Sequence, residues 1–282
     1  MPELPEVETI ALQLNEVLVG KMVSMVTVYR EKNFLGDKSN LVGRKIKRVG
    51  RKAKMVGIEF ENFDGLVQVH LKMTGQLIFV DGEKRVVGGH PTSDWVKNLP
   101  SKFTRVEIGF DNGSRLFFND MRAFGWMRVT TKKEQDRQTK DMPPDVVDLE
   151  FTLKYFENIL KRYKRPIKIV LLDQQLMGGI GNIYANDALN LAKILPTRRA
   201  SDLTKVEVKK LYEAVKYVIG LGIKYGGASA SNYVDTKGLG GTYQNYFLTY
   251  KREGQPCKNC GEKIVKMKLG GRGTFYCPAC QK

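Results

Sequence analysis

The sequence predicts an α+β protein of several domains: a β-rich N-terminal part with flanking helices, a helical middle part, and a small zinc-stapled hairpin at the C-terminus. Three observations predict this class. Apolar and polar side chains alternate with period two through residues 22–130, as in strands. Beyond residue 150 the apolar period becomes helical. All four cysteines of this chain of 282 residues lie near its C-terminal end.

The first predicted element is a helix that begins within the opening residues MPELPEVET. Its apolar face gives the chain end a surface on which to dock. If Met1 is removed, Pro2 carries a free secondary amine whose pKa lies near that of an α-amino group, and such an amine can act as a nucleophile. On residues alone, Pro2 is equally well N-terminal punctuation, and Glu3 an acid at the positive end of a helix dipole. The face comprises Leu4, Val7, Ala11, Leu14 and Leu18, and Gly20 ends the pattern.

Residues 22–130 contain strand-like segments that we expect to form a two-layer β-sandwich. Examples are MVSMVTVY, KMVGIEF, LVQVHLKM, RVEIGF and SRLFFN. Asp111, Asn112 and Gly113 join the last two segments, which is a hairpin signal. The stretch 131–150 is polar and charged with two adjacent prolines, so it is interpreted as a linker.

Two helices are expected after the linker. Phe156, Ile159, Leu160 and Tyr163 share one helix face, and the pair Thr204 and Glu207 forms a capping-box signature before the next helix. Between them lies the segment QQLMGGIGNIYANDAL, whose glycines allow tight turns and leave Asn182 at the start of another helix. A helix N-terminus there could receive a phosphate, or the segment is only a turn with an N-cap.

The cysteines have the spacing of a metal site. Cys257, Cys260, Cys277 and Cys280 form two C-x2-C pairs separated by sixteen residues, which predicts one structural zinc ion with four thiolate ligands. The alternative is a pair of disulfides, which an intracellular location disfavours. The strands KIVKMKL and TFYC between the pairs form a hairpin with Arg272 at its tip. Such an arginine is either solvated or placed for a phosphate or minor-groove contact.

The overall charge indicates a polyanionic partner. Forty-seven Lys and Arg against 30 Asp and Glu give a formal net charge of +17 and a pI of about 9.6, so nucleic acid is the first partner to consider. An acidic membrane surface is the alternative polyanionic partner. No apolar run approaches 18 residues and no signal-peptide pattern is present, so we expect an intracellular protein without a membrane partner.

Five segments in order resemble the bacterial formamidopyrimidine-DNA glycosylase family, which is related to endonuclease VIII. They are PELPEVET, HLKMTG at 70–75, NDMRAFG at 119–125, LLDQQLMGGIGNIYANDAL at 171–189, and the four-cysteine hairpin. The resemblance implies a catalytic domain at 1–130, a helix-two-turn-helix DNA-binding domain at 151–235 and a zinc finger at 236–282. It also implies a monomeric, cytoplasmic and nucleoid-associated base-excision repair enzyme that is both a DNA glycosylase and an AP lyase. Its partner would be double-stranded DNA containing oxidised purines, such as 8-oxoguanine and formamidopyrimidines.

The resemblance also assigns catalytic roles to individual residues. Pro2 would attack the sugar C1′ and form a Schiff base that acts as an electron sink. Glu3 would be the general acid, a role that needs a raised pKa, and Glu6 would help to organise the amine. Lys54 and Arg272 would assist the β- and δ-eliminations. Without the resemblance, Lys54 would be interpreted as a solvated lysine in a basic run.

DNA-contacting residues follow from the same resemblance. Met73, Arg122 and Phe124 would fill the gap left by a flipped base, with Arg122 bonded to the orphaned partner base, commonly cytosine. Core packing is the alternative for Met73 and Phe124. Positions that resemble phosphate contacts are His70, Arg105, Lys164, Lys168 and Asn182. His70 is alternatively an ordinary hydrogen-bonded strand histidine.

Three features depart from the family pattern. Lys72 stands where a small residue is common, Ala123 replaces a second basic residue after Arg122, and the stretch GGASASNYVDTKG, near the damaged-base loop, is atypical. The sequence therefore leaves the preferred lesion open. Two other functions compete with repair catalysis. The first is a zinc-finger protein that binds and bends DNA without catalysis, which would explain the positive charge. The second is an RNA-binding zinc-ribbon protein, but the sequence contains no recognisable RNA-binding aromatic motif.

Overall fold

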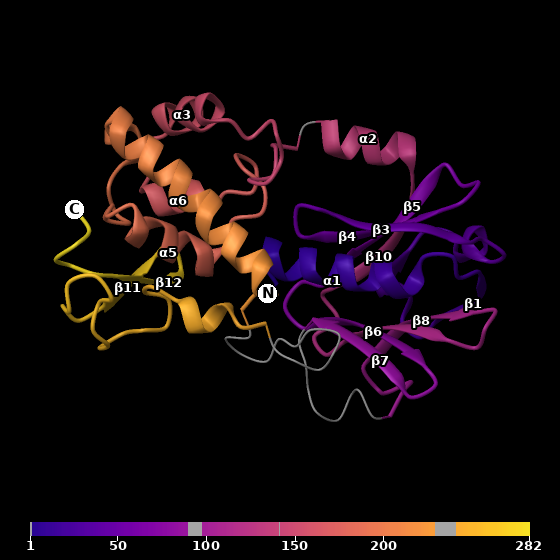
Figure 1. Cartoon of the computed structure of the whole chain (residues 1–282). Coiled ribbons are helices and arrows are strands. Elements are labelled where there is room, and N and C mark those ends of the chain that lie inside the picture. The colour runs from indigo at the N-terminus through magenta and orange to yellow at the C-terminus, as the bar shows by residue number, and fades with distance from the viewer. Residues whose placement is uncertain (1, 90–97, 141, 229–240) are drawn as a thin grey trace. The chain divides into compact units, whose positions relative to one another are not determined.

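The structure is a computed structural model that describes residues 2–89, 98–140, 142–228 and 241–282. The chain divides into two compact units (Figure 1). The first comprises Met1–Asp141 and Tyr225–Thr242, and the second Met142–Lys224 and Tyr243–Lys282. The helical part and the cysteine hairpin thus share one unit. The four-part division expected from the sequence stays a prediction, and its boundary at residue 235 lies outside the described residues.

The first unit contains two five-stranded sheets. In the first sheet the order is β1 (Val23–Val28), β8 (Thr104–Phe110), β9 (Arg115–Asp120), β6 (Gly75–Asp81) and β7 (Lys84–Gly89). In the second sheet it is β2 (Phe34–Leu35), β10 (Trp126–Thr131), β5 (Gly65–His70), β4 (Met55–Phe60) and β3 (Ile46–Lys52). The 3-10 turns η1 (Glu31–Asn33) and η2 (Lys38–Leu41) flank β2. Only the β2–β10 pair is parallel among the described pairings.

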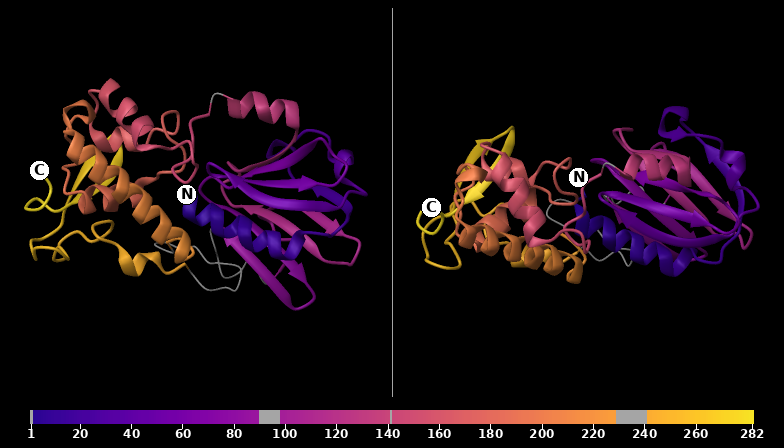
Figure 2. Two further views of the ribbon diagram at one scale, coloured as in Figure 1. Left: turned by 45° about the horizontal axis from the view of Figure 1, so that its top comes forward. Right: turned by 90° about the horizontal axis from the view of Figure 1, so that it is seen from above.

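Helix α1 (Leu4–Leu18) completes the core between these sheets. It packs against β3 and β7, which are edge strands of different sheets, and Figures 1 and 2 show it lying along the sandwich. Its buried face joins the main apolar cluster with residues of both sheets. The approach is close, because a Cβ at Gly88 of β7 would lie 2.6 Å from Cγ1 of Ile10. The predicted sandwich and N-terminal helix are therefore confirmed.

Part of the expected linker is helical. Residues Lys132–Lys140 form helix α2 directly after β10, which the sequence interpretation of 131–150 did not anticipate. A capping box explains its start: the Glu134 carboxylate accepts from the amide of Thr131 at 3.0 Å, and the Thr131 hydroxyl accepts from the amide of Glu134 at 3.2 Å. The sequence contains this T-x-x-E signal, but no apolar periodicity follows it, because the helix is polar throughout.

The second unit is built from helices and the cysteine hairpin. The elements are α3 (Leu153–Arg162), α4 (Ile167–Leu171), α5 (Asn182–Leu191), η3 (Ala200–Asp202), α6 (Lys205–Lys224), η4 (Tyr243–Tyr246), β11 (Val265–Leu269) and β12 (Arg272–Tyr276). Helix α5 packs on α6 and also contacts β12. The capping box of Thr204 and Glu207 before α6 is confirmed. Within the described ranges, no helix has the length and apolar character needed to cross a membrane.

A buried carboxylate ties α5 to the segment that leads to the hairpin. Asp187 is 0% exposed and accepts hydrogen bonds from the amides of Leu248, Thr249 and Tyr250 at 2.9–3.2 Å, and from the Tyr243 hydroxyl at 3.2 Å. Burial raises the pKa of Asp187, and these four bonds oppose the rise. The carboxylate therefore fixes the start of the zinc-finger segment on the helical body.

Candidate active site and DNA-contact surface

The chain end is held in place by the first turn of α1. Glu3 is its N-cap, and a capping box pairs the Glu3 carboxylate with the Glu6 amide and the Glu6 carboxylate with the Glu3 amide, the latter at 2.8 Å. Glu3 is 6% exposed and Glu6 is 2% exposed. Pro2 is half-buried and directly precedes this turn. The structure thus holds Pro2 next to a buried, hydrogen-bonded pair of carboxylates.

The second oxygen of Glu6 binds a distant part of the same unit. Its Oε1 accepts from the amide of Ala228 at 2.8 Å. The neighbouring Gly227 has φ +81, and a Cβ there would lie 2.6 Å from Cγ of Glu6, so both conformation and space require glycine. Because both Glu6 oxygens accept backbone bonds, this carboxylate suits an organising role. Most of the GGASASNYVDTKG stretch follows directly and lies outside the described residues.

Lys54 occupies the turn of the β3–β4 hairpin. Lys52 pairs with Met55, so Ala53 and Lys54 form a two-residue loop, with Ala53 at φ +50. Arg51 supports this turn by donating to the Ala53 carbonyl at 2.9 Å. The same guanidinium forms a salt bridge with Glu8 of α1. Lys54 is 8% exposed, so the interpretation as a solvated lysine is wrong. A buried lysine at a strained turn is an arrangement found at functional sites.

Met73, Arg122 and Phe124 come together on the surface of the first unit. Arg122 Nη1 lies 3.2 Å from Sδ of Met73, and its guanidinium stacks over the Phe124 ring at 4.7 Å. Met73 is 47% exposed and Phe124 55% exposed. The alternative prediction, that these two side chains pack in the core, is therefore wrong. The cluster presents a sulfur, a cation and an aromatic face to solvent, which suits insertion into a base stack.

Asp120 holds the loop that carries Arg122 and Phe124. Its carboxylate is 0% exposed and accepts from the amide of Gly125 at 2.6 Å, the amide of Arg122 at 3.2 Å and the hydroxyl of Thr74. Asn33 closes the other side by donating to the Gly125 carbonyl at 2.6 Å. Asp120 lies within NDMRAFG, one of the segments that resemble the family, but the sequence predicts no role for it because a buried loop clamp depends on the loop geometry.

Two of the departures from the family pattern lie in left-handed backbone. Lys72 has φ +51 and Ala123 has φ +53, a conformation that costs a non-glycine residue about 1–2 kcal/mol. Ala123 is 5% exposed, and its carbonyl accepts from Asn33 at 3.2 Å. The position after Arg122 is thus part of the loop packing and presents no long side chain to a ligand.

His70 ends β5 beside the cluster. Its Nδ1 accepts from the amide of Lys72 at 3.1 Å, and its ring lies 5.8 Å from that of Trp126. Burial, aided by the charges of Lys72 and Lys54, lowers the pKa of His70 from 6.5 to about 4. The ring is therefore neutral near pH 7, with its proton on Nε2, which can donate to an anion. Both a phosphate contact and a hydrogen-bonded strand histidine fit this geometry.

Arg105 is engaged with the backbone. It donates from Nε to the Asp120 carbonyl at 2.8 Å and from Nη1 to the Lys102 carbonyl at 3.3 Å. Burial, followed by the charge of Arg30, lowers its pKa. Half-exposed, it braces the end of β9. Its placement as a phosphate contact stays a prediction.

In the second unit, Arg272 stands beside the hairpin tip. Gly270 and Gly271 have φ +56 and +75 and form a two-residue turn closed by the pair Leu269 and Arg272. Two successive positive φ values define a type I′ turn, which favours glycine at both positions. Arg272 is exposed. The predicted hairpin is confirmed, and it presents this arginine to solvent.

Three side chains dock this hairpin on the helices, and one of them corrects an expectation. Lys168 is 0% exposed and donates to the Gly273 carbonyl at 3.0 Å and to the Thr274 hydroxyl at 2.8 Å. It therefore supports the hairpin from within and cannot meet a phosphate from solvent. Asn182, the first residue of α5, donates to the same carbonyl at 3.1 Å. Asn186 accepts from the Phe275 amide at 2.8 Å, a contact the sequence did not suggest. Lys164 is exposed.

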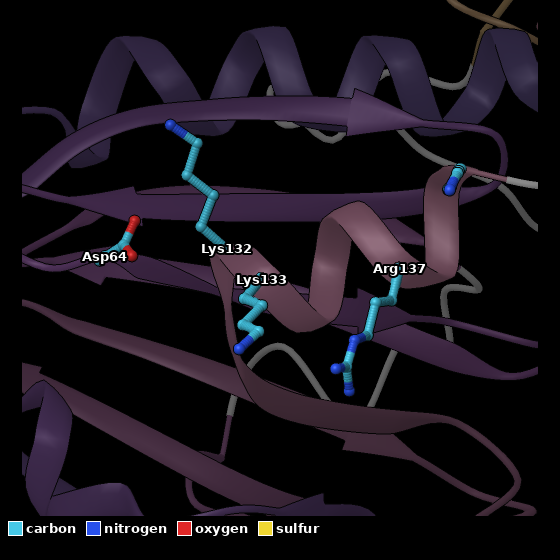
Figure 3. Close-up of a pocket in the computed structure, with 5 residues that line it drawn as sticks. Asp64, Lys132, Lys133 and Arg137 are labelled. Atoms are coloured by element: carbon cyan, nitrogen blue, oxygen red, sulfur yellow. The ribbon is translucent and has the colours of Figure 1, made fainter.

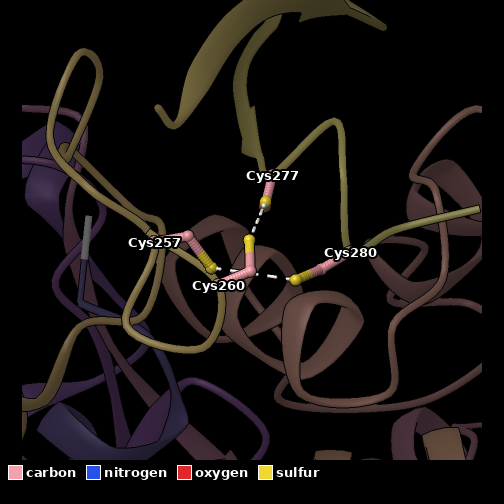
Figure 4. Close-up of side chains that lie close together, drawn as sticks. All are labelled: Cys257, Cys260, Cys277 and Cys280. Atoms are coloured by element: carbon pink, nitrogen blue, oxygen red, sulfur yellow. Dashed lines mark hydrogen bonds between the residues drawn. The ribbon is translucent and has the colours of Figure 1, made fainter. Parts of the chain in front are cut away.

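The four cysteines converge as predicted (Figure 4). Their sulfur atoms lie within 4.8 Å of one another, with Cys257 to Cys280 at 4.0 Å and Cys260 to Cys277 at 3.5 Å. Tetrahedral Zn–S bonds of about 2.3 Å place sulfurs about 3.8 Å apart, so the donor set fits zinc. All four thiols are free, against the disulfide alternative. With four thiolates, the ion would be structural.

A β-sandwich with an exposed stacking cluster, together with a helical unit carrying a four-cysteine hairpin, defines a zinc-containing DNA-binding protein. Models of the formamidopyrimidine-DNA glycosylase N-terminal domain, its H2TH domain and the zinc finger found in FPG and IleRS match residues 1–127, 142–234 and 254–282. Formamidopyrimidine-DNA glycosylase from Desulforamulus reducens is 39% identical, with 100% of this chain and 99% of the relative covered. The enzyme from Pelotomaculum thermopropionicum is 36% identical over the same shares.

Solved structures agree. The MutM (Fpg) protein from Thermus thermophilus matches with a TM-score of 0.84 and 31% identity, covering 99% of this chain and 98% of that one. Lactococcus lactis Fpg in complex with DNA containing an abasic site matches with a TM-score of 0.87 and 28% identity, covering 100% of both chains. The chain therefore belongs to the formamidopyrimidine-DNA glycosylase family.

Replacing Asp120 by alanine should destabilise the first unit by about 3 kcal/mol, because buried donors lose a charged acceptor. Urea unfolding measures this. Glu83→Ala, which removes an exposed carboxylate from the β6–β7 turn, should change stability by less than about 0.5 kcal/mol. Equal effects of the two substitutions would contradict the clamp.

His70 should contribute a loss of stability in acid. Its folded-state pKa of about 4 lies below the ordinary 6.5, so the unfolded chain binds the extra proton first as the pH falls. The contribution is complete above pH 6.5 and declines toward pH 4, by at most about 3 kcal/mol. Unfolding of the wild type and His70→Asn across this range should show a shallower decline in the variant. Parallel curves would disprove the shift.

Zinc should be bound at one ion per chain and lost on substitution of a ligand. Cys280→Ser leaves three thiolates and should reduce the zinc content measured by elemental mass spectrometry to nearly none, with an earlier melting transition for the second unit. Ser201→Ala, remote in sequence, should retain the ion. A wild-type protein without zinc, whose intact mass shows the hydrogen loss of two disulfides, would refute the site.

Proposed function

We propose that the protein is a bifunctional DNA glycosylase and AP lyase of base-excision repair, which removes oxidised purines such as 8-oxoguanine and formamidopyrimidines from duplex DNA. The observation that carries the proposal is Pro2, held directly before the buried capping box of Glu3 and Glu6. Family membership supports it. So do the solved relatives, among which are complexes of Lactococcus lactis Fpg with Fapy-dG-containing DNA and with abasic DNA.

The chemistry starts at the secondary amine of Pro2, once Met1 has been removed. Its lone pair attacks the sugar C1′ as the glycosidic bond breaks, and the departing base or the sugar receives a proton from Glu3. Loss of the amine proton and opening of the sugar ring give an iminium ion. That cation accepts the electron pair left when a C2′ proton is removed, so the 3′ phosphate departs, and a second elimination expels the 5′ phosphate. Water then releases Pro2.

Other groups would position DNA for these steps. Met73 and Phe124 would wedge into the stack and Arg122 would bond the base opposite the gap, since all three are solvent-facing side chains of one cluster. Lys54 and Arg272 would supply positive charge near the departing phosphates. The DNA backbone would be contacted by the exposed Lys164, by Asn182 and by the neutral His70. Arg105 would contact it through the guanidinium N–H groups that do not already donate to carbonyls. One chain carries all these groups, so we propose a monomer.

Borohydride trapping on an 8-oxoguanine duplex tests this chemistry. The mature protein should give a covalent adduct that peptide mapping assigns to Pro2, and one extra residue before Pro2 should abolish it, because an amide nitrogen is not nucleophilic. Glu3→Gln should slow single-turnover excision by about 10²-fold or more. Lys54→Gln should slow strand cleavage, whereas Lys47→Gln, an exposed neighbour in the same basic run, should not.

The contrary outcomes are specific. Salt-sensitive DNA binding without an adduct, from zinc-loaded protein beginning at Pro2, would favour the non-catalytic DNA-bending alternative. An adduct that maps to Lys54 would show that Lys54, and not Pro2, is the nucleophile. Trapping on oxidised pyrimidines in preference to purines would overturn the proposed lesion class.

A further inference from the structure

Helix α2 carries a stripe of positive charge that the proposed chemistry does not use. Lys133, Arg137 and Lys140 follow one another at intervals of four and three residues, which places them on one helix face. All three are exposed, and Figure 3 shows Lys133 and Arg137 directed to the same side. Together with Lys132 they form the α2 basic patch.

The patch borders a shallow pocket. The pocket has a volume of about 360 Å³ and is lined by these four cations and one acid, Asp64. The Asp64 carbonyl accepts from the Lys132 amide at 3.0 Å, which fixes the start of α2 beside it. An open pocket lined by four positive side chains and one negative side chain is suited to a polyanion.

One acid of the same helix, Glu134, is engaged at the helix start. Glu134 accepts from Thr131 and Thr130 at the start of the helix, and these bonds lower its pKa. Its charge is thereby held at the N-terminal turn. Among the described side chains, no ion pair neutralises Lys132, Lys133, Arg137 or Lys140.

We propose that the α2 basic patch binds phosphates of duplex DNA that flank the damaged site. The stripe rises about 6 Å from Lys133 to Arg137 and about 10 Å to Lys140. Phosphates on one strand repeat every 3.4 Å or so along the duplex axis, so these cations span about three phosphates. The assignment rests only on DNA as the partner and does not require the proposed excision chemistry.

The fold separates this patch from the stacking cluster. Strand β10 begins at Trp126, which pairs with His70 beside Met73, and it ends at Thr131, where α2 starts. Its six residues cover about 17–20 Å, equivalent to about five base pairs. The start of the patch would therefore meet flanking duplex. It should add affinity for long DNA without touching the reacting nucleotide.

The test compares charge removal on two helices. Lys133→Gln, Arg137→Gln and Lys140→Gln are combined, and the control combines Lys205→Gln, Lys209→Gln and Lys210→Gln, three exposed positions of α6. Binding to undamaged duplexes of about 10 and about 30 base pairs is measured against salt concentration, where each lost phosphate contact reduces the slope by about 0.9. Glutamine preserves helix propensity in both triples.

For the long duplex, the α2 triple should weaken binding at least tenfold and reduce the salt slope by about two to three, while the control changes both much less. Asp64→Asn should strengthen binding. An unchanged slope, or equal losses from both triples, would overturn the proposal by showing only a net-charge effect. Because undamaged DNA is used, failure of Pro2 trapping would leave this result standing, and the reverse also holds.

Discussion

The arrangement around the N-terminus depends on one carboxylate. Glu6 uses one oxygen to accept from the Glu3 amide and the other to accept from the Ala228 amide, at 2.8 Å each. The first bond fixes the chain end beside Pro2. The second joins it to the segment Tyr225–Ala228 of the same unit, where Gly227 is the residue that fits. A chain end is ordinarily mobile, and this pair of bonds would hold the proposed Pro2 amine in position.

The same principle organises the second unit. Lys168, Asn182 and Asn186 form hydrogen bonds with backbone groups near Arg272. Asp187 accepts hydrogen bonds from the backbone of the preceding segment. The zinc site staples the base of the hairpin, and two glycines form its turn. An exposed arginine on such a support loses little conformational freedom when it meets a phosphate, which favours its use in binding or catalysis.

The sequence was sufficient wherever one local rule decided the outcome. The α1 periodicity, the Thr204 capping box, the hairpin glycines and the cysteine spacing each predicted their element. It failed where tertiary contacts decide. The burial of Lys168 and Lys54 depends on residues far away in the chain. The same is true of the Asp120 clamp and of the second bond of Glu6. The helix at 132–140 is not evident from the sequence, because its composition is polar throughout and only the Thr131 and Glu134 capping box marks its start.

The claim that Glu6 fixes the proposed catalytic amine of Pro2 is tested most directly by hydrogen exchange. Peptides covering residues 2–10 and 225–228 are compared in wild type and Glu6→Ala, alongside single-turnover excision. We predict that the Glu3 and Ala228 amides both exchange at least about tenfold faster in the variant and that excision slows with them, since each loses a charged acceptor. Unchanged protection at both amides, or normal excision despite lost protection, would contradict the account.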